Sequence, residues 1–300
     1  MPISLQKLIK KFGQYKEVPS HSDEVRFCCP YCVNIGKPPD TKFHLYVNLT
    51  KGVGYCFRCG KVLRFSKDLK TIISFNGTKN TYTNIRKTLS FLKEIPKCRE
   101  IYDTPAFEFL MAKLSGIYSI DFIKKFIEEY DLKLCVDKKY PYLYYRIMIP
   151  IKFNGKLVGF QFRSIFGEEP KYLSLGYQKE NIKSYLFNYD RAKSEKIVYL
   201  VEGVFDILPI QDRAVAVFGK YLTENQINLV KLTWEFPVVV FDRDAISDAY
   251  KTVGELLRSG FERVGVIELN SEKDPCEMGF EFKKLPIKEL SIIDIISLNL

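Results

Sequence analysis

The sequence predicts a multidomain α/β protein with a β-rich N-terminal ribbon, then an α+β region, then an α/β domain with a parallel sheet. Three observations lead to this prediction: paired cysteines near the N-terminus, mixed helix and strand patterns in the middle, and apolar strands alternating with helices after residue 196. The 300 residues, 46% hydrophobic and 27% charged, suit about two domains of ordinary composition. This composition excludes disordered and fibrous chains.

The charge is uneven along the chain and favours a polyanionic partner for its N-terminal part. The formal net charge is +10, and residues 1–70 carry +8 of it, with 13 Lys and Arg against 5 Asp and Glu. A merely solvated, lysine-rich surface is the alternative. No apolar run approaches the ~18 residues that span a bilayer, and the start lacks the apolar stretch of a secretion signal. We therefore expect a cytoplasmic protein with no membrane partner.

Two C-x-x-C knuckles predict a structural zinc site. They are Cys29-Pro-Tyr-Cys32 and Cys56-Phe-Arg-Cys59, separated by 23 residues. Without a secretion signal, paired cysteines are more often metal ligands than disulfides. Four thiolates complete a closed tetrahedral shell around one Zn²⁺. The spacer contains the β-prone segment 42–48, so we expect a zinc ribbon with two or three short strands between the knuckles.

Neighbouring residues leave alternatives for the ligand set. Cys28 could replace Cys29, although Cys29 gives the tighter knuckle. His44 could be a ligand or contact a nucleic-acid base, but four cysteines already fill the shell. The alternative without a metal is that the four cysteines are buried free thiols. The remaining cysteines stand apart from any His or Cys cluster, and we expect core or surface positions for them: Cys98, Cys135 and Cys276.

Pattern and composition divide the chain into five segments. We expect the zinc ribbon, a polar linker with one helix around 85–92, an α+β segment, an α/β segment and a short apolar tail that packs on the body or docks a partner. Their ranges are 1–66, 67–103, 104–195, 196–280 and 281–300.

The α+β segment contains clear helix and hairpin signals. Thr104 is a plausible N-cap with Pro105 at the first helical position. Apolar residues at helical spacing predict a second helix over 120–130. Strand patterns follow at 142–150, 152–163 and 171–173, and Asn154-Gly155 predicts a tight hairpin turn.

The α/β segment alternates apolar strands with helices. Continuous apolar strands of this kind predict a parallel sheet covered on both faces, whose active groups gather at the carboxyl ends of the strands. A helix begins after Thr223, and others are expected at 204–210 and 245–258. The expected strands are 197–201, 214–218, 236–241 and 263–269.

Acidic residues follow three of these strands. Glu202 ends the first, Asp242 and Asp244 end the third, and Asp274 and Glu277 follow the fourth. Carboxylates gathered at one edge repel one another unless a cation joins them, and oxygen ligands favour Mg²⁺ or Mn²⁺. Such a site suits phosphoryl transfer. Acidic strand ends that arise by chance are the alternative.

These residues carry a resemblance to a known family. The acidic motifs resemble the three motifs of a Toprim domain: Glu202-Gly-Val-Phe-Asp206, Asp242-Arg-Asp244 and Lys273-Asp-Pro-Cys-Glu277. The segment Phe218-Gly-Lys-Tyr-Leu-Thr223 resembles the stretch between the first two motifs. The preceding residues are similar to the RNA-polymerase domain of bacterial and phage DNA primases, on Ile149-Pro-Ile, Val158-Gly-Phe-Gln-Phe-Arg163, Pro170-Lys-Tyr-Leu-Ser and Tyr185-Leu-Phe-Asn.

The resemblance implies a DNA primase, a DNA-directed RNA polymerase that makes short RNA primers on single-stranded DNA during replication. It implies that 104–195 is the N-terminal subdomain of the polymerase domain and that 196–280 is the Toprim catalytic domain. It implies catalytic metal ligands at Glu202, Asp242 and Asp274, with support from Asp244. Glu202 would also assist deprotonation of the attacking 3′-hydroxyl.

Basic residues are expected to hold the substrates. The resemblance places Arg163, Lys171 and Lys183 at positions that bind ribonucleoside triphosphate or the template and primer. Arg58 and Lys61, beside the second knuckle, are candidates for phosphate contact. Solvated surface cations are the alternative for these residues. Asp206 is expected to cap or pair rather than bind metal, and Glu277 to support the site or be solvated.

The resemblance covers residues 25–280 and departs from the family at two places. Ala245-Ile-Ser-Asp248 replaces a stretch that usually contains glycine, and Phe162 replaces a small residue. Alternative functions are a non-catalytic zinc and Toprim DNA-binding protein of recombination, or a Toprim nuclease or topoisomerase. No P-loop motif occurs in the sequence, so a separate replicative helicase is the expected partner.

Overall fold

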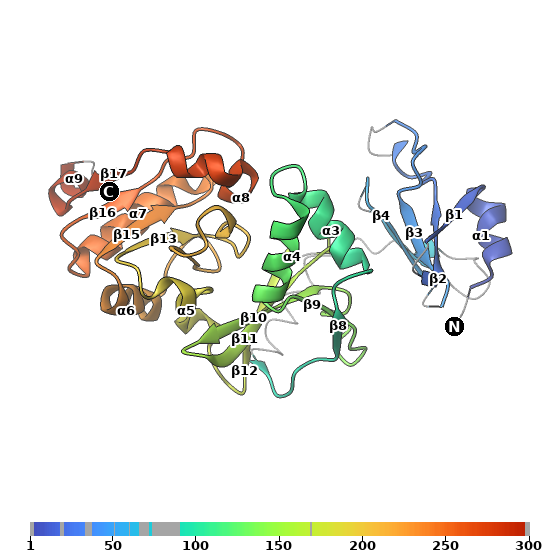
Figure 1. The fold of residues 1–300 in the computed structure, drawn as a ribbon, viewed down its shortest axis with the longest axis horizontal. Helices are drawn as coiled ribbons and strands as arrows, with labels where there is room; N and C mark the ends of the chain where they lie inside the picture. The colour runs from blue at the N-terminus through green and yellow to red at the C-terminus, as the bar shows by residue number, and fades with distance from the viewer. Residues whose placement is uncertain are drawn as a thin grey trace. The chain divides into compact units, whose positions relative to one another are not determined.

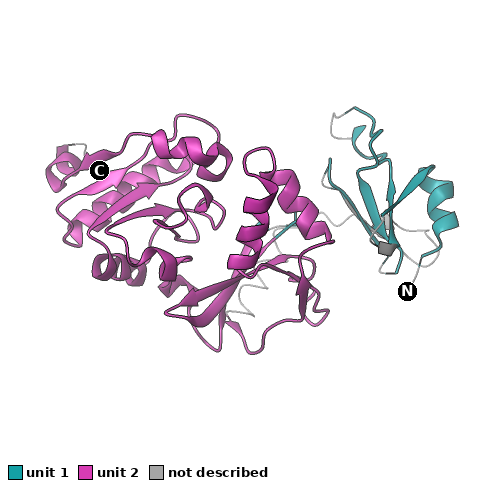
Figure 2. Ribbon diagram, in the orientation of Figure 1, with its two compact units in different colours: residues 1–85, 164–171 teal, residues 86–163, 172–300 magenta. Residues whose placement is uncertain are grey.

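The computed structural model describes residues 3–18, 21–33, 38–50, 52–59, 61–65, 72–73, 91–168 and 170–297. The chain divides into two compact units, one of residues 1–85 with 164–171 and one of residues 86–163 with 172–300 (Figure 2). Among the described residues, no helix has the length and apolar character needed to cross a membrane. The five segment boundaries expected from the sequence stay predictions.

The first unit is a small antiparallel β-sheet with one helix, α1 (Leu5–Phe12). The six strands follow one another in the sheet in chain order. β3 and β4 lie between the two knuckles, as the ribbon prediction required, and Leu8, Phe27 and Leu45 form part of the buried core. The strands are β1 (Tyr15–Val18), β2 (His21–Phe27), β3 (Leu45–Asn48), β4 (Val53–Cys56), β5 (Val62–Phe65) and β6 (Ile72–Ile73).

The second unit begins with a mixed sheet in the order β7-β12-β11-β10-β9-β8 and two helices (Figure 1). Thr104 caps α3 as predicted, since its Oγ1 accepts a hydrogen bond of 3.2 Å from Ala106 N and Pro105 opens the helix. The elements are β7 (Phe91–Leu92), β8 (Cys98–Glu100), α3 (Pro105–Leu114), α4 (Ile120–Glu129), β9 (Lys133–Cys135), β10 (Ile147–Phe153), β11 (Lys156–Arg163) and β12 (Tyr172–Tyr177).

The turn between β10 and β11 is the predicted Asn-Gly hairpin. Asn154 and Gly155 both have positive φ, 50° and 76°, as a tight two-residue turn requires. Asp190, in α5 (Tyr189–Ala192), accepts hydrogen bonds of 2.8 Å from the backbone N–H groups of both turn residues. Lys193 lies 3.1 Å from the same carboxylate. These donors lower the pKa of Asp190, although burial opposes them.

Asp190→Asn is expected to lower the free energy of unfolding by about 1 kcal/mol at pH 7, because charge-assisted hydrogen bonds become neutral ones. The pKa of Asp190 is lower in the folded chain than the value of 3.8 in the unfolded chain. The ionised carboxylate therefore stabilises the fold above pH 3.8, and this stabilisation is lost as the pH falls through the folded-state pKa. Urea unfolding at pH 7 and pH 3 measures both effects. An equal difference between variant and wild type at the two pH values would contradict this role of the charge.

The α/β sheet of the second unit has the order β14-β13-β15-β16-β17 (Figure 1). Its first four strands are parallel, as predicted, and β17 is antiparallel to β16. Thr223 and Gln226 form a capping box at the start of α6. The elements are β13 (Ile197–Val201), β14 (Ala214–Ala216), α6 (Glu224–Thr233), β15 (Phe236–Val240), α7 (Ile246–Arg258), β16 (Val264–Val266), α8 (Pro275–Met278), β17 (Lys288–Leu290) and α9 (Ile292–Ser297).

Three sequence expectations need correction. The helix expected at 204–210 is only a 3₁₀ turn, η3 (Leu208–Ile210), and Pro209 cannot donate a backbone hydrogen bond there. Residues 142–146 form a turn before β10 rather than a strand. A helix was expected around 85–92, but Phe91 and Leu92 form the strand β7. The remainder of that range, 85–90, lies outside the described residues.

The apolar tail packs on the body, which was one of the two expectations for it. Leu290 of β17 and Ile295 of α9 are buried in the core of the α/β sheet, together with Val253 and Leu257 of α7. The last strand therefore extends the sheet.

Candidate catalytic and metal sites

The acidic residues lie where the parallel strands end. Glu202 directly follows β13, and Asp242 follows β15 after Phe241. The backbone N–H of Asp242 donates a hydrogen bond of 2.8 Å to Glu202 Oε1, so these two strand ends are in contact. Asp244 lies in the next turn, η4 (Arg243–Ala245). Asp274 is the N-cap of α8.

The environment of Glu202 disfavours its charged form. Burial, followed by the negative charges of Asp242 and Asp244, raises the pKa of Glu202 to about 7, although the backbone hydrogen bond and Lys220 oppose this shift. Without a divalent cation, the protonated form of this carboxyl group is therefore more favoured than for an ordinary glutamate. A cation beside it would favour the carboxylate.

Asp206 belongs to the same acidic neighbourhood. It is 8% exposed, and its Oδ2 accepts a hydrogen bond of 2.8 Å from Gly203 N. The helix that it was expected to cap is absent, so the role expected for Asp206 stays a prediction. Burial and the charges of Asp274 and Asp242 raise its pKa well above the usual value. The proximity to those two carboxylates was not foreseen, because the sequence only placed Asp206 in the segment after the first strand.

Two lysines form ion pairs with Asp244 and Asp274, and the sequence analysis did not identify either lysine. Lys220 Nζ lies 2.7 Å from Asp244 Oδ2, and Lys113 Nζ lies 4.0 Å from Asp274 Oδ2. Lys220 falls within the segment 218–223, whose resemblance to the family was the available signal. No local signal points to Lys113, because α3 is remote in the chain from α8.

The side chains of each site decide whether it fits a metal ion. We looked among the described residues for three or more Cys, His, Asp or Glu side chains whose ligand atoms lie within 4.8 Å of one another. The group that meets this condition is Cys29, Cys32, Cys56 and Cys59. The carboxylates of the strand ends are thus spaced more widely than a gathered ligand set.

The four predicted cysteines lie together. Cys29 Sγ is 3.6 Å from Cys59 Sγ, and Cys32 Sγ is 3.7 Å from Cys56 Sγ. A disulfide has an S–S distance of ~2.05 Å, so none is formed. A tetrahedral zinc with Zn–S bonds of ~2.3 Å has sulfurs about 3.8 Å apart, which these distances fit. Cys28 is not part of this group.

Asp40 organises the first knuckle. Its carboxylate accepts hydrogen bonds from Cys29 N at 2.8 Å, Lys42 N at 2.9 Å and His44 N at 2.9 Å. His44 Nδ1 lies 2.7 Å from the same carboxylate. Because His44 is engaged with Asp40 and is absent from the gathered group, the geometry favours the four-cysteine set.

The predicted substrate-binding cations occupy different surroundings. The Arg163 guanidinium lies 4.7 Å from the Tyr172 ring centre and 5.4 Å from that of Phe109. Lys183 Nζ donates a hydrogen bond of 2.7 Å to Phe218 O, two residues before Lys220 in the chain.

Three further cations belong to the first unit. Lys171 is exposed, and its backbone oxygen accepts a hydrogen bond from Ser164. Arg58 Nη1 donates to Pro39 O at 3.0 Å. Lys61 Nζ lies 5.7 Å from the Tyr31 ring centre.

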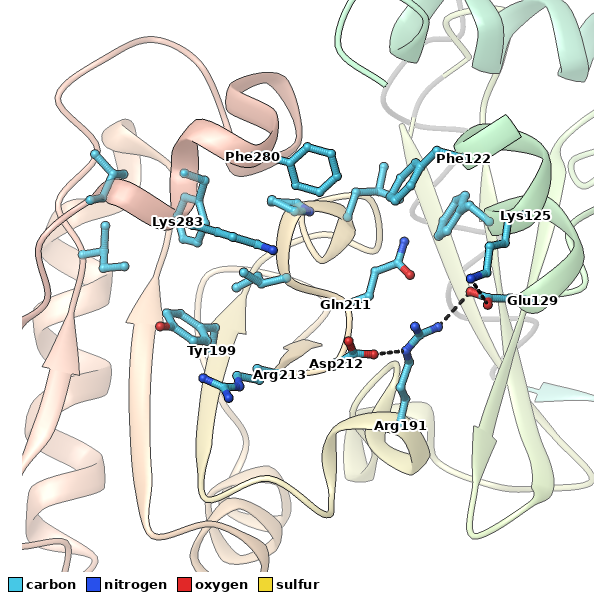
Figure 3. Close-up of a pocket in the computed structure, with 17 residues that line it drawn as sticks. Phe122, Lys125, Glu129, Arg191, Tyr199, Gln211, Asp212, Arg213, Phe280 and Lys283 are labelled. Carbon is cyan, nitrogen blue, oxygen red and sulfur yellow. Dashed lines mark hydrogen bonds and ion pairs between the residues drawn. The ribbon is translucent and has the colours of Figure 1, made fainter. Parts of the chain in front are cut away.

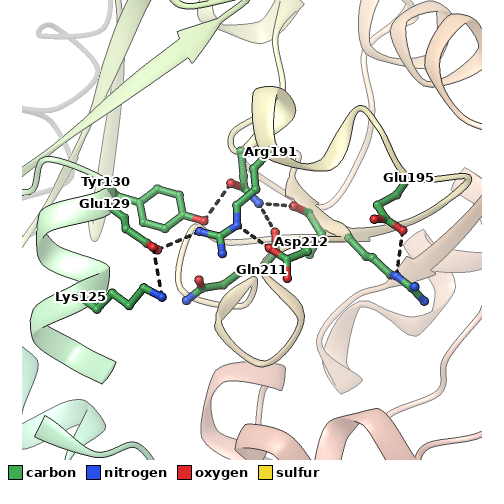
Figure 4. Close-up of polar contacts among 10 residues, drawn as sticks. Lys125, Glu129, Tyr130, Arg191, Glu195, Gln211 and Asp212 are labelled. Carbon is green, nitrogen blue, oxygen red and sulfur yellow. Dashed lines mark hydrogen bonds and ion pairs between the residues drawn. The ribbon is translucent and has the colours of Figure 1, made fainter. Parts of the chain in front are cut away.

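A cavity of about 470 Å³ also opens in the second unit, between α4 and the segment around 208–213 (Figure 3). Arg191 stands at one side of it and bridges Glu129 at 2.8 Å and Asp212 at 2.6 Å (Figure 4). None of the predicted site residues lines this cavity. Lys125, Glu129, Arg191 and Asp212 of its lining are joined by ion pairs, and we assign the cavity no part in the chemistry.

Comparisons with known proteins support the resemblance seen in the sequence. No family model matches the chain. A DNA primase of Synechococcus elongatus is 32% identical over 152 residues, which are 44% of this chain and 22% of that protein. A DNA primase of Staphylococcus aureus is 33% identical over 190 residues, which are 54% of this chain and 31% of that protein.

The fold has a counterpart among solved structures. The zinc-binding and RNA polymerase domains of the Aquifex aeolicus primase match 95% of this chain with a TM-score of 0.50 and 21% identity, over 83% of that structure. The chain is therefore similar to bacterial-type DNA primases, and the predicted fold class is confirmed. It spans less than a third of the length of the two curated relatives.

Proposed function

We propose that this chain is a DNA primase, which synthesises short RNA primers on single-stranded DNA by metal-dependent nucleotidyl transfer. The observation that carries the proposal is the meeting of Glu202 and Asp242 at the ends of adjacent parallel strands, with Asp244 nearby, in a chain similar to bacterial primases. Asp274 belongs to this neighbourhood through Asp206, whose pKa both Asp274 and Asp242 raise. The similarity to primases disfavours the recombination and nuclease alternatives. The proposed setting is the cytoplasm, with a separate replicative helicase delivering the template.

In the proposed reaction, the primer 3′-hydroxyl attacks the α-phosphorus of a ribonucleoside triphosphate, and pyrophosphate leaves. Glu202, Asp242, Asp244 and Asp274 would hold Mg²⁺ or Mn²⁺, which stabilises charge on the attacking and leaving oxygens. Glu202, at the end of β13 beside Asp242, would also accept the hydroxyl proton. Lys183 and Arg163 supply positive charge for the triphosphate or the template.

The ribbon has a separate proposed role. One structural Zn²⁺ would bind Cys29, Cys32, Cys56 and Cys59, and Arg58, Lys61 and Lys171 would contact nucleic-acid phosphates. The support for this proposal is the spacing of the four sulfurs and the +8 charge of residues 1–70.

A direct assay tests the proposed function. Purified protein is incubated with single-stranded DNA, the four ribonucleoside triphosphates and Mg²⁺, and the products are resolved on a denaturing gel. We expect short RNA products that require both the DNA and the divalent cation. A folded, zinc-loaded protein that yields no RNA on templates of varied sequence, with Mg²⁺ or Mn²⁺, would count against the proposal.

Lys61→Gln is expected to weaken binding to single-stranded DNA in a salt-dependent way. Each lost phosphate contact lowers the slope of log K against log salt concentration by roughly 0.7. Lys10→Gln is the matched control, because Lys10 is an exposed lysine on α1 that we do not assign to DNA. Fluorescence anisotropy at several salt concentrations measures both slopes, and equal slopes for the two variants would remove Lys61 from the interface.

A further inference from the structure

We propose that Lys220 is a built-in counter-cation of the carboxylate site, which competes with the divalent cation for Asp244. This inference rests on the metal site of the proposed function. The ammonium of Lys220 lies 2.7 Å from Asp244 Oδ2, where it satisfies a carboxylate that the metal would use. Sequence comparison of motifs assigns a role to Asp244 but none to Lys220.

The backbone holds Lys220 in this place. Phe218 has φ +62° and Gly219 has φ +150°, and a bulky residue at positive φ persists only where its surroundings hold it. Lys183 Nζ donates to Phe218 O at 2.7 Å on one side of the turn. On the other side, the capping box of Thr223 fixes the start of α6. These contacts hold the backbone on both sides of Lys220, and the ion pair with Asp244 places its ammonium.

The charge of Lys220 acts on more than Asp244. The hydrogen bond to Asp244 and the charges of Asp244, Glu202 and Asp242 raise its pKa, although partial burial opposes them. Lys220 in turn lowers the pKa of Asp244 and opposes the upward shift at Glu202. One ammonium thus offsets part of the repulsion among three carboxylates.

The wide spacing of the carboxylates agrees with this role. Among the described acidic residues, no three offer ligand atoms gathered within 4.8 Å, and Asp244 is turned to Lys220. A divalent cation that binds Asp244 has to displace the ammonium of Lys220. This competition lowers the affinity of the divalent cation for the nucleotide-free site. When a triphosphate accompanies the cation, the displaced ammonium gains an anionic partner. Lys220 would therefore couple metal binding to nucleotide binding.

Metal binding without nucleotide tests the inference. Mn²⁺ is titrated into the zinc-loaded 300-residue chain without nucleotide or DNA, and the free ion is followed by its paramagnetic resonance signal. Lys220→Met is expected to tighten Mn²⁺ binding roughly 2- to 5-fold, which is the upper part of the range for an exposed ion pair. A non-hydrolysable ribonucleoside triphosphate is expected to shrink the difference between variant and wild type.

Lys251→Met is the matched control. Lys251 lies 3.4 Å from Asp248 on α7 and is also exposed, so its removal changes the net charge equally without touching the carboxylate site. It is expected to leave Mn²⁺ affinity within twofold of wild type. In an Asp244→Asn background, Lys220→Met is expected to have a smaller effect on Mn²⁺ affinity, because the carboxylate that pairs with the ammonium is gone and only its charge on Glu202 and Asp242 remains.

The outcomes separate this inference from the proposed function. Equal Mn²⁺ affinity in wild type and Lys220→Met, or equal tightening in Lys251→Met, would overturn the role of Lys220 and leave the metal site standing. Failure of all variants to bind Mn²⁺, with or without triphosphate, would overturn both. Circular dichroism of each variant checks that it is folded.

Discussion

Asp242→Asn is expected to lower ribonucleotide incorporation by roughly two orders of magnitude or more, the loss typical of a preorganised electrostatic group. The substitution removes one negative charge beside Glu202 while nearly preserving shape, so it tests charge rather than folding. Glu202→Gln is expected to be at least as damaging, because it also removes the proposed proton acceptor. The measurement is the initial rate of RNA synthesis on single-stranded DNA with Mg²⁺.

The matched control is Asp248→Asn, which makes the same chemical change on α7 outside the carboxylate site and is expected to keep wild-type activity. Both Asp242→Asn and Glu202→Gln are expected to remain folded and to bind single-stranded DNA, because the basic residues are unchanged. Normal rates of primer synthesis in both would show that this site is not the active site and would favour a DNA-binding role.

Cys56→Ser is expected to lose tightly bound zinc and to unfold the ribbon. Cys56 is fully buried, its Sγ lies 3.7 Å from Cys32 Sγ, and β4 ends at this residue. Structural zinc sites contribute about 10–16 kcal/mol of binding free energy, which becomes folding free energy. Elemental analysis is expected to find one zinc per wild-type chain, and limited proteolysis is expected to cut the variant within the N-terminal unit.

Cys28→Ser is the control for this experiment. Cys28 precedes the first knuckle but lies outside the gathered sulfurs, so this variant is expected to keep its zinc and its resistance to protease. Full zinc content in Cys56→Ser, or loss of zinc in Cys28→Ser alone, would contradict the ligand set.

Local signals account for what could be predicted of the fold. The Asn154-Gly155 turn, the cap at Thr104 and the capping box at Thr223 each depend on residues within four positions of one another. The strand at 197–201 was predicted to the residue, because an uninterrupted apolar run specifies a buried strand of a parallel sheet. The predicted helix at 204–210 failed, since Pro209 limits it to a short 3₁₀ turn.

For the candidate site, the sequence by itself determined which acids and cysteines are available and, through parallel strands, that Glu202 and Asp242 share one edge. It also determined the cysteine spacing on which the ribbon depends. Only the tertiary structure decided which cations pair with the acids. Lys113 is remote in the chain from Asp274. Lys220 reaches Asp244 from a turn in which Phe218 has positive φ, and no local sequence pattern predicts that conformation. Burial, which raises the pKa values of Glu202 and Asp206, is likewise a property of the packed chain, because neighbours from several elements exclude water together.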